Sequence, residues 1–333
     1  MRILWIILFY VTLTPGLRAQ ETRLQVVASA SIFADMAREI GGDGVAVRSI
    51  VPIGGDPHIH EPTPADAILV SGADLILRNG LTFEGWLNEL IENSGSDAEV
   101  VTITDGVKPI ESLEYQNATD PHAWMDASLG LIYLRNIKNA LVRLDPDNRA
   151  MYETNYEVYR RQIRDLDDYI RTTIQEIPEA SRVIVTSHDA FQYYGRRYGL
   201  ALEAVLGVST DAEVQTSDIA RLTQTLRERN VPAIFVETTI NPKLLQQIAA
   251  DNDVCIGGSL YADSLGDSES PAPTYYDMLK HNTDILVAAL TRPRGDCALL
   301  EPEVGFWTNL ILYGVLAFLL IGGFGYVALN ITD

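Results

Sequence analysis

The feature of this sequence that most constrains its fold is a run over residues 148–177 that contains no glycine or proline before Pro178. Apolar side chains recur along the run at helical steps, which is the pattern of a helix with one buried face. About 30 residues at roughly 1.5 Å each would span about 45 Å, which is more than one small lobe needs. The run therefore predicts one long helix that joins two lobes.

Strand and helix patterns alternate on both sides of this run. The expected strands are residues 24–29, 45–50, 73–77, 100–103, 183–187, 202–206, 233–236 and 254–256. Such alternation is typical of parallel sheets whose faces are covered by helices. We therefore expect an α/β fold with two Rossmann-like lobes, each built on a four-stranded, mainly parallel sheet.

Both ends of the chain are apolar. Residues 1–19 combine Arg2, an apolar stretch and a break at Pro15, which predicts an export signal peptide. Retention as an anchor is the alternative, because Leu17 is large for its place before the expected cut. Residues 304–328 carry no charge and are long enough to cross a bilayer, so they predict a transmembrane helix, with a buried core helix as the alternative.

These patterns divide the chain into five expected parts. They are a signal peptide at 1–19, an N-terminal lobe at 22–145, a linking helix at 146–178, a C-terminal lobe at 179–298 and a transmembrane helix at 304–328. The expected location is the periplasm, or the outer face of the cytoplasmic membrane with the last helix in the lipid bilayer. In an exported protein the pair Cys255 and Cys297 favours a disulfide, and two buried thiols are the alternative.

The charge balance excludes one class of partner. The chain has 45 acidic and 25 basic residues, a formal net charge of −20. No basic stripe is present to neutralise phosphates, so nucleic acid is not an expected partner.

Histidines mark the candidate site. There are five in the chain, and His58 and His122 each follow an Asp-Pro pair. His188 comes directly after a predicted strand, and ligands of open α/β sheets bind beyond the carboxyl ends of strands. Three neutral imidazoles and a carboxylate would suit Zn²⁺, with Mn²⁺ as the alternative. Asp263 is a candidate for that carboxylate, and Glu213 and Glu237 are alternatives.

Several strings in the chain resemble those of the zinc- and manganese-binding solute-binding proteins of bacterial ABC importers. They are residues 54–64, 120–126, 187–194, 236–243 and 258–266, and the resemblance covers roughly residues 24–292. It implies two metal-binding lobes joined by one long helix, with a divalent ion between them. The ligands that it implies are His58, His122, His188 and Asp263.

The resemblance also implies a role without catalysis, namely capture of a metal outside the cytoplasm and its delivery to a membrane permease. Histidine at the third ligand position favours zinc. Three carboxylates are candidates for orienting the imidazoles: Glu61, Asp189 and Glu237. Residues 111–119 lack the histidine-rich loop of many zinc members, His60 stands where the family often has tyrosine, and a C-terminal apolar span is not typical.

Two other functions remain open at this stage. An exported zinc-dependent hydrolase would need an open coordination position and a base. The sequence contains neither a His-Glu-x-x-His helix nor a Gly-x-Ser-x-Gly elbow. A metal-binding adhesin could use the same two lobes.

Overall fold

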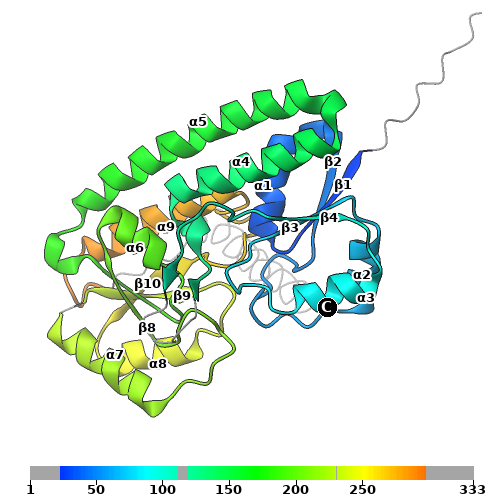
Figure 1. The fold of residues 1–333 in the computed structure, drawn as a ribbon. Helices are drawn as coiled ribbons and strands as arrows, with labels where there is room; N and C mark the ends of the chain where they lie inside the picture. The colour runs from blue at the N-terminus through cyan, green and yellow to red at the C-terminus, as the bar shows by residue number, and fades with distance from the viewer. Residues whose placement is uncertain (1–22, 112–118, 230, 298–333) are drawn as a thin grey trace, which may run out of the picture.

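The computed structural model describes residues 23–111, 119–229 and 231–297. The expected signal peptide at 1–19 and the expected transmembrane helix at 304–328 lie outside these residues. The described part forms two α/β lobes, with one long helix running along both of them (Figure 1). Two lobes and a connecting helix therefore fit the fold expected from the alternation of strands and helices.

The first lobe is built on one parallel sheet with the strand order β2-β1-β3-β4. The strands are β1 (Leu24–Ala28), β2 (Val45–Ser49), β3 (Leu75–Arg78) and β4 (Glu99–Thr102), and the helices are α1 (Ser31–Gly41), α2 (Pro64–Ser71) and α3 (Leu87–Ser94). Val26 of β1 lies between Val47 of β2 and Leu75 of β3, so the centre of the sheet is apolar. A short antiparallel pair, β5 (Ile110–Glu111) and β6 (Thr119–Asp120), follows.

The second lobe differs from the single four-stranded sheet that we expected. Its strands form two parallel pairs, β7 with β8 and β9 with β10, and β7 lies against β9. The strands are β7 (Val183–Thr186), β8 (Ala201–Ala204), β9 (Ala233–Glu237) and β10 (Cys255–Leu260). Just beyond β7 the backbone amides of Ser187 and His188 donate to the side chain of Glu237, so they are not available to a ladder with β9.

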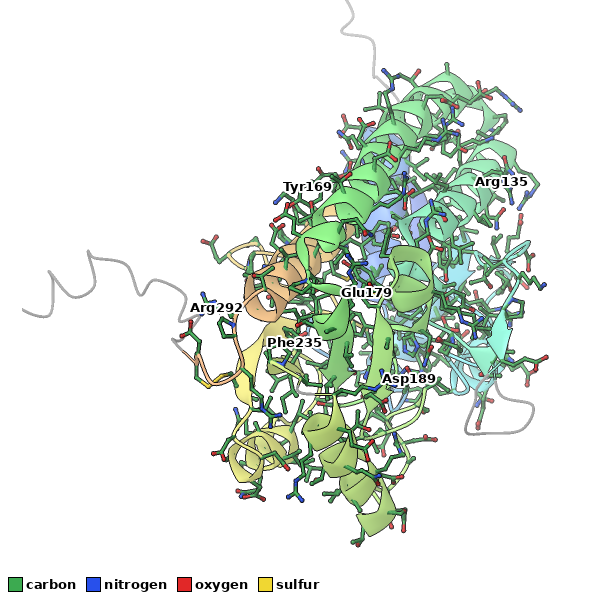
Figure 2. The ribbon with its side chains drawn as sticks, turned by 90° about the vertical axis from the view of Figure 1, so that its left-hand side faces the viewer. Arg135, Tyr169, Glu179, Asp189, Phe235 and Arg292 are labelled. Atoms are coloured by element: carbon green, nitrogen blue, oxygen red, sulfur yellow. A yellow bond between two sulfur atoms is a disulfide. The ribbon has the colours of Figure 1, made fainter. Side chains whose placement is uncertain are left out.

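The remaining helices cover the two lobes. They are α4 (Ala127–Leu144), α5 (Arg149–Thr173), α6 (Gln192–Tyr198), α7 (Thr216–Glu228), α8 (Lys243–Asp251) and α9 (Tyr275–Leu290). Short 3₁₀ turns are η1 (Gly42–Gly44), η2 (Ala123–Met125), η3 (Pro146–Asn148), η4 (Ile174–Glu176) and η5 (Glu179–Ser181). The long helix α5 contacts α1, α4 and α9, and Figure 2 shows its Tyr169 beside α9, where the hydroxyl bonds to Asp284.

The largest hydrophobic core crosses the boundary between the lobes. It contains residues of α1, α4, α5 and α9 together with Trp124 and Phe235. Trp124 packs against Phe33 and Phe83, with ring centroids 5.4 and 4.9 Å apart, and its Nε1 donates to the carbonyl of Ala262 in the second lobe at 3.0 Å. Shared packing of this kind limits how far the lobes can move independently.

The fold prediction is corrected in one respect: the transmembrane helix that it included is not among the helices that the structure describes. Among the described residues, none of the helices is both long enough and apolar enough to cross a membrane. The longest, α5, is amphipathic: it buries a stripe that includes Ile163 and Ile170, and its other face carries ion pairs such as Arg149 with Glu153. Charges along one face would be costly in lipid, which explains why length alone does not make such a helix a membrane span.

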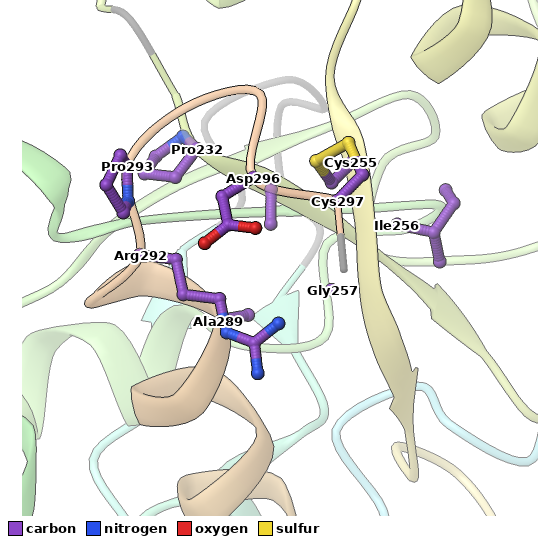
Figure 3. A pocket seen from close by; sticks show the side chains of 10 residues that line it. Pro232, Cys255, Ile256, Gly257, Ala289, Arg292, Pro293, Asp296 and Cys297 are labelled. Atoms are coloured by element: carbon purple, nitrogen blue, oxygen red, sulfur yellow. A yellow bond between two sulfur atoms is a disulfide. The ribbon is translucent and has the colours of Figure 1, made fainter. Parts of the chain in front are cut away.

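A disulfide joins the two cysteines. Cys255 at the start of β10 and Cys297 after α9 are bonded, with Cα atoms 5.2 Å apart (Figure 3). The bond ties the segment after the last helix to the sheet of the second lobe. Free cysteines are absent from the described part of the chain.

Candidate metal centre

Four side chains from distant parts of the chain meet between the lobes. One ligand atom from each of His58, His122, His188 and Asp263 can be chosen so that all four lie within 4.8 Å of one another. Nε2 of His122 lies 3.2 Å from Nε2 of His58 and 3.3 Å from Nε2 of His188. The Asp263 oxygens lie 3.3 Å from Nε2 of His122 and 3.2 Å from Nε2 of His188. The side chains are 3% exposed for His58 and 0% for the other three.

The four residues all lie in segments that follow strands. His58 lies in the loop after β2, His122 follows β6, His188 follows β7 and Asp263 follows β10. His58, His188 and Asp263 follow the carboxyl ends of parallel strands, where open α/β sheets present their ligands. His122 follows the short antiparallel strand β6 and joins them in the same cluster. Each lobe therefore supplies two of the four side chains.

The repeated Asp-Pro-His string has a local structural role. In both copies the aspartate accepts a hydrogen bond from the backbone amide of the histidine two residues later, at 2.9 Å for Asp56 with His58 and for Asp120 with His122. Aspartate side chains commonly stabilise turns in this way. The string thus sets the backbone direction from which each imidazole enters the cluster.

Carboxylates stand behind two of the three imidazoles. Oδ1 of Asp120 lies 2.7 Å from Nδ1 of His122, and Oε2 of Glu237 lies 2.5 Å from Nδ1 of His188. A carboxylate on Nδ1 fixes the tautomer and leaves Nε2 directed at the centre. Among the residues that the structure describes, no carboxylate contacts Nδ1 of His58, whose ring packs on Phe83 at 4.8 Å.

The other candidates for orienting an imidazole lie elsewhere. Glu61 is exposed, and Asp189 accepts a hydrogen bond from Gln192 at 3.0 Å. Of the three carboxylates suggested by the sequence, only Glu237 contacts one of the clustered imidazoles. Sequence reasoning missed Asp120, although its place in the repeated string was a usable signal.

The two remaining histidines do not join the cluster. Nε2 of His60 lies 3.2 Å from Asp66, and its ring packs against Trp86 at 4.8 Å. His281 lies on α9 against Tyr261, with centroids 5.6 Å apart.

Burial and nearby charges shift the pKa values of the three imidazoles in different directions. Burial lowers the pKa of His58 to about 3, against the attraction of Asp263. Burial would also lower the pKa of His122, but Asp120 and Asp263 outweigh it and raise the pKa to about 9. Burial likewise opposes charge on His188, whose pKa is nevertheless raised well above its ordinary value by Glu237 and Asp263.

Asp263 is the charged centre of the cluster. Burial would raise the pKa of its carboxyl, but the adjoining imidazoles of His188 and His122 hold the pKa well below its ordinary value. Neither of its oxygens has a hydrogen-bond partner among the described residues. An ionised, buried carboxylate without hydrogen bonds is costly unless a cation faces it. The cluster therefore fits a divalent metal held by three nitrogens and one or two oxygens.

The loop that carries His58 is hydrogen-bonded to the second lobe. We call residues 50–63 the His58 loop. The hydroxyl of Thr210 donates to Oδ2 of Asp56 at 2.6 Å, and the backbone amide of Gly54 donates to Oγ of Ser264 at 2.8 Å. Both bonds join the lobes, beside the cluster.

The hollow in Figure 3 is not part of this centre. It measures about 20 Å³ and lies beside the disulfide, lined by residues such as Pro232, Arg292 and Asp296. A space of this size holds about one water molecule. None of the four clustered side chains lines it.

Comparison with known proteins places the chain among metal-binding transport proteins. Residues 26–289 match the family model described as zinc-uptake complex component A periplasmic, ZnuA. The chain is 38% identical over 269 residues to the manganese-binding lipoprotein MntA of Halalkalibacterium halodurans, covering 81% of this chain and 89% of that protein. It is 34% identical over 279 residues to the manganese ABC transporter substrate-binding lipoprotein PsaA of Streptococcus pneumoniae, covering 81% and 90%.

Solved structures show the same fold. The periplasmic zinc-binding protein TroA from Treponema pallidum superposes with a TM-score of 0.78 at 32% identity, over 81% of this chain and 100% of that one. The Mn-bound periplasmic metal-binding protein from Candidatus Liberibacter asiaticus gives 0.74 at 33% identity, over 80% and 100%.

Proposed function

The chain belongs to the ZnuA family of zinc-uptake components, and we propose that it captures a divalent transition metal outside the cytoplasm and delivers it to the permease of an ABC importer. One observation carries the proposal for the residues involved. Three imidazole nitrogens and a carboxylate converge in a buried space between the two lobes. His58, His122, His188 and Asp263 are the proposed ligands.

The same geometry argues against the hydrolase alternative. A catalytic zinc keeps a coordination position open to substrate and water. The proposed ligands are 0–3% exposed, which leaves no access for a substrate. Burial is what a carrier needs, because it slows the loss of its cargo until the lobes move.

For the cargo we propose Zn²⁺ first, with Mn²⁺ as the alternative. Three imidazoles and one carboxylate form a set that suits tetrahedral zinc. The names of the relatives include both metals, since MntA is called manganese-binding and TroA zinc-binding. Both oxygens of Asp263 face the imidazoles, so a bidentate carboxylate could add the further oxygen ligand that suits manganese.

An extracytoplasmic location is supported by the disulfide. Disulfides persist in oxidising compartments and are rare in the cytosol. The bond between Cys255 and Cys297 is therefore consistent with a protein that works outside the cytoplasmic membrane.

The test of the proposed ligands is metal analysis of the purified protein and a matched pair of variants. The wild-type chain should carry one equivalent of zinc or manganese, and His122→Ala should lose most of it, because the remaining ligands leave an incomplete, buried site. His281→Ala is the control, since His281 lies against Tyr261 outside the cluster, and it should keep the full equivalent.

Uptake by cells is the second readout. A strain that depends on this chain should lose metal uptake with His122→Ala and keep it with His281→Ala. Full retention of metal by His122→Ala would contradict the proposed ligand set.

A further inference from the structure

A strained turn lies in the first lobe between β3 and α3, which are both labelled in Figure 1. Three consecutive residues in it have left-handed backbone angles: φ is 79° at Gly80, 51° at Leu81 and 65° at Thr82. Glycine adopts such angles without steric cost, but leucine rarely does, and a β-branched threonine does so more rarely still. Strain of this kind persists only where surrounding contacts enforce it, and it is concentrated at functional sites. The angles therefore indicate that other groups hold this turn in place.

The side chain of Glu84 holds the start of the turn. Glu84 is buried, and its Oε1 accepts hydrogen bonds from the backbone amide of Asn79 and from Oγ of Ser29, both at 2.6 Å. Its Oε2 accepts from the backbone amide of Gly80 at 3.1 Å. A buried carboxylate is costly unless it is hydrogen-bonded, and these three donors meet that requirement. Because Ser29 directly follows β1, one side chain joins the turn to the central part of the sheet.

The turn is also joined to the segment that carries His122. Nδ2 of Asn79 donates to the carbonyl of Pro121 at 3.0 Å, and Oδ1 of Asn79 accepts from the hydroxyl of Tyr133 at 2.8 Å. Pro121 directly precedes His122. These two bonds do not involve Glu84, so a change at Glu84 leaves them in place.

The turn places Phe83 against the ring of His58. The two ring centroids are 4.8 Å apart and the ring planes cross at 85°, which is an edge-to-face contact. The ring of His122 is further from Phe83, at 6.2 Å. Trp124 packs on Phe83 at 4.9 Å, and Phe83 is 1% exposed, so close packing fixes its position. Edge-to-face contacts between aromatic rings are favourable and depend on orientation. The orientation of the His58 ring is therefore coupled to that of Phe83.

We propose that Phe83 orients the imidazole of His58, as a carboxylate does for each of the other two clustered imidazoles. Glu84 acts on His58 through Phe83, because it enforces the turn that presents the phenyl ring. Both are positioning residues, since neither belongs to the cluster of ligand atoms. The inference rests on the proposed function, because it takes His58 to be a ligand of the transported metal.

The test is zinc release from the full chain, loaded with one equivalent of Zn²⁺ and mixed with an excess of chelator in a stopped-flow instrument. Phe83→Leu keeps an apolar side chain but removes the flat ring that limits rotation of the imidazole away from the ion. The dissociation rate should rise about fivefold with little change in the association rate, because most differences in affinity appear in dissociation. Zinc stoichiometry should stay at one, since all four proposed ligands remain.

Phe235→Leu is the matched control. Phe235 is a fully buried residue of the same hydrophobic core, and in the described part of the chain the ring contacts of the three imidazoles do not include it. Both substitutions remove the same atoms from a packed core, so both should lower the melting temperature of the metal-free protein. A merely structural role of Phe83 would leave zinc release the same in the two variants, whereas a positioning role speeds release in Phe83→Leu alone.

Glu84→Gln tests whether Glu84 acts through Phe83. Glutamine has one acceptor oxygen in place of two, so the three hydrogen bonds of Glu84 cannot all be kept. Release should become about threefold faster. The double variant should then release zinc about as fast as Phe83→Leu alone, whereas independent effects would multiply to about fifteenfold.

Each outcome bears on a separate claim. Release at the wild-type rate by Phe83→Leu, or an equal acceleration in Phe235→Leu, would overturn the role of Phe83. Multiplied effects in the double variant would overturn the action of Glu84 through Phe83. In all these cases one bound zinc per chain leaves the proposed function intact, whereas a wild-type chain that binds neither zinc nor manganese would count against the proposed ligand set itself.

Discussion

The three clustered imidazoles are not equivalent. His122 and His188 each have a carboxylate on Nδ1, whereas His58 packs its ring on Phe83. Two of the proposed ligands, one in each lobe, are therefore oriented by a carboxylate, and the position of the third depends on its loop. This difference suggests an order of events in which His58 is the first ligand to leave the ion.

Glu237 should matter for metal affinity although it does not touch the ion. Glu237→Gln keeps an oxygen that can accept from the amides of Ser187 and His188, both at 2.9 Å, but it removes the negative charge from Nδ1 of His188. We expect the dissociation constant to rise roughly 10- to 100-fold, the usual effect of losing such a carboxylate. Competition with a chelator of known affinity measures it.

The control for this prediction is Asp189→Asn. Asp189 is the residue next to His188, yet its bond is to Gln192. It should change the affinity by less than about threefold. Equal losses in both variants would mean that general charge near the site, and not orientation of His188, sets the affinity.

Metal binding should release protons. His122 has a pKa of about 9 without metal, so it is charged at neutral pH and must become neutral to bind the ion. His58, with a pKa of about 3, is already neutral and releases none. Apparent affinity should therefore rise with pH up to about 9, by about tenfold per pH unit for each proton released.

Calorimetry in buffers of different ionisation enthalpy counts these protons. Asp120→Asn should lower the count between pH 6 and 8, because Asp120 is a main cause of the raised pKa of His122. A binding constant that does not change between pH 6 and 8 would contradict the protonation states described here.

At the scale of elements, the His58 loop is hydrogen-bonded to the second lobe. Asp56 holds the amide of His58 with one oxygen and receives the hydroxyl of Thr210 from the second lobe with the other. A single carboxylate thus links the position of a proposed ligand to the position of the opposite lobe.

Removing the hydrogen bond between Thr210 and Asp56 should speed metal release. Thr210→Val removes the hydroxyl and keeps the shape of the side chain. We expect the dissociation rate to rise several-fold with little change in association, since one neutral-to-charged hydrogen bond contributes about 1.5–3 kcal/mol at most. Stopped-flow release to an excess of chelator measures the rate.

Thr172→Val provides the comparison, because Thr172 is an exposed residue of α5 that bonds to the carbonyl of Asp168. It should release metal at the wild-type rate. Identical rates for Thr210→Val and the wild type would show that the loop is held by other contacts.

At the scale of the whole molecule, the lobes share one core and several buried contacts. Asp35 on α1 accepts a hydrogen bond from the first amide of α9, that of Tyr275, at 2.8 Å. Burial raises the pKa of Asp35 to about 6. A charged group is thus placed at the junction of the lobes, where desolvation disfavours its ionised form.

Asp35 should make stability depend on pH in a defined direction. Its pKa in the folded protein lies above the value of 3.8 expected when unfolded, so between about pH 4 and 6 the folded state binds more protons. The free energy of unfolding should therefore fall as pH rises through this window, by on the order of 2–3 kcal/mol from this group. Asp35→Asn keeps an acceptor for Tyr275 and should remove that contribution.

Denaturant unfolding of both proteins at pH 4 and pH 7 tests this. The variant should gain stability relative to the wild type as pH rises. Asp189, whose pKa burial also raises to about 6, should leave part of the slope in both proteins. A constant difference between the two proteins at both pH values would show that Asp35 does not titrate in this range.

Local features were predictable because they depend on near neighbours in the chain. The unbroken amphipathic pattern of residues 148–177 is enough for a long helix, and α5 covers Arg149–Thr173. The Asp-Pro-His strings also act locally, because each aspartate bonds to an amide two residues away. The apolar pattern at 304–328 was read in the same local way, but these residues lie outside the part of the chain that the structure describes, and in that part no helix is long and apolar enough to cross a membrane.

The sequence by itself determined the connecting helix, the strands of both lobes and the three histidines that follow strands, since these follow from periodicity and local bonding. Only the tertiary structure decided that Asp263 lies among the imidazoles while Glu237 stands behind His188, 49 residues away along the chain. It also decided that the second lobe pairs its strands in two sets. These pairings depend on how the helices and sheets pack, and packing joins residues whose separation in sequence carries no record of their distance in space.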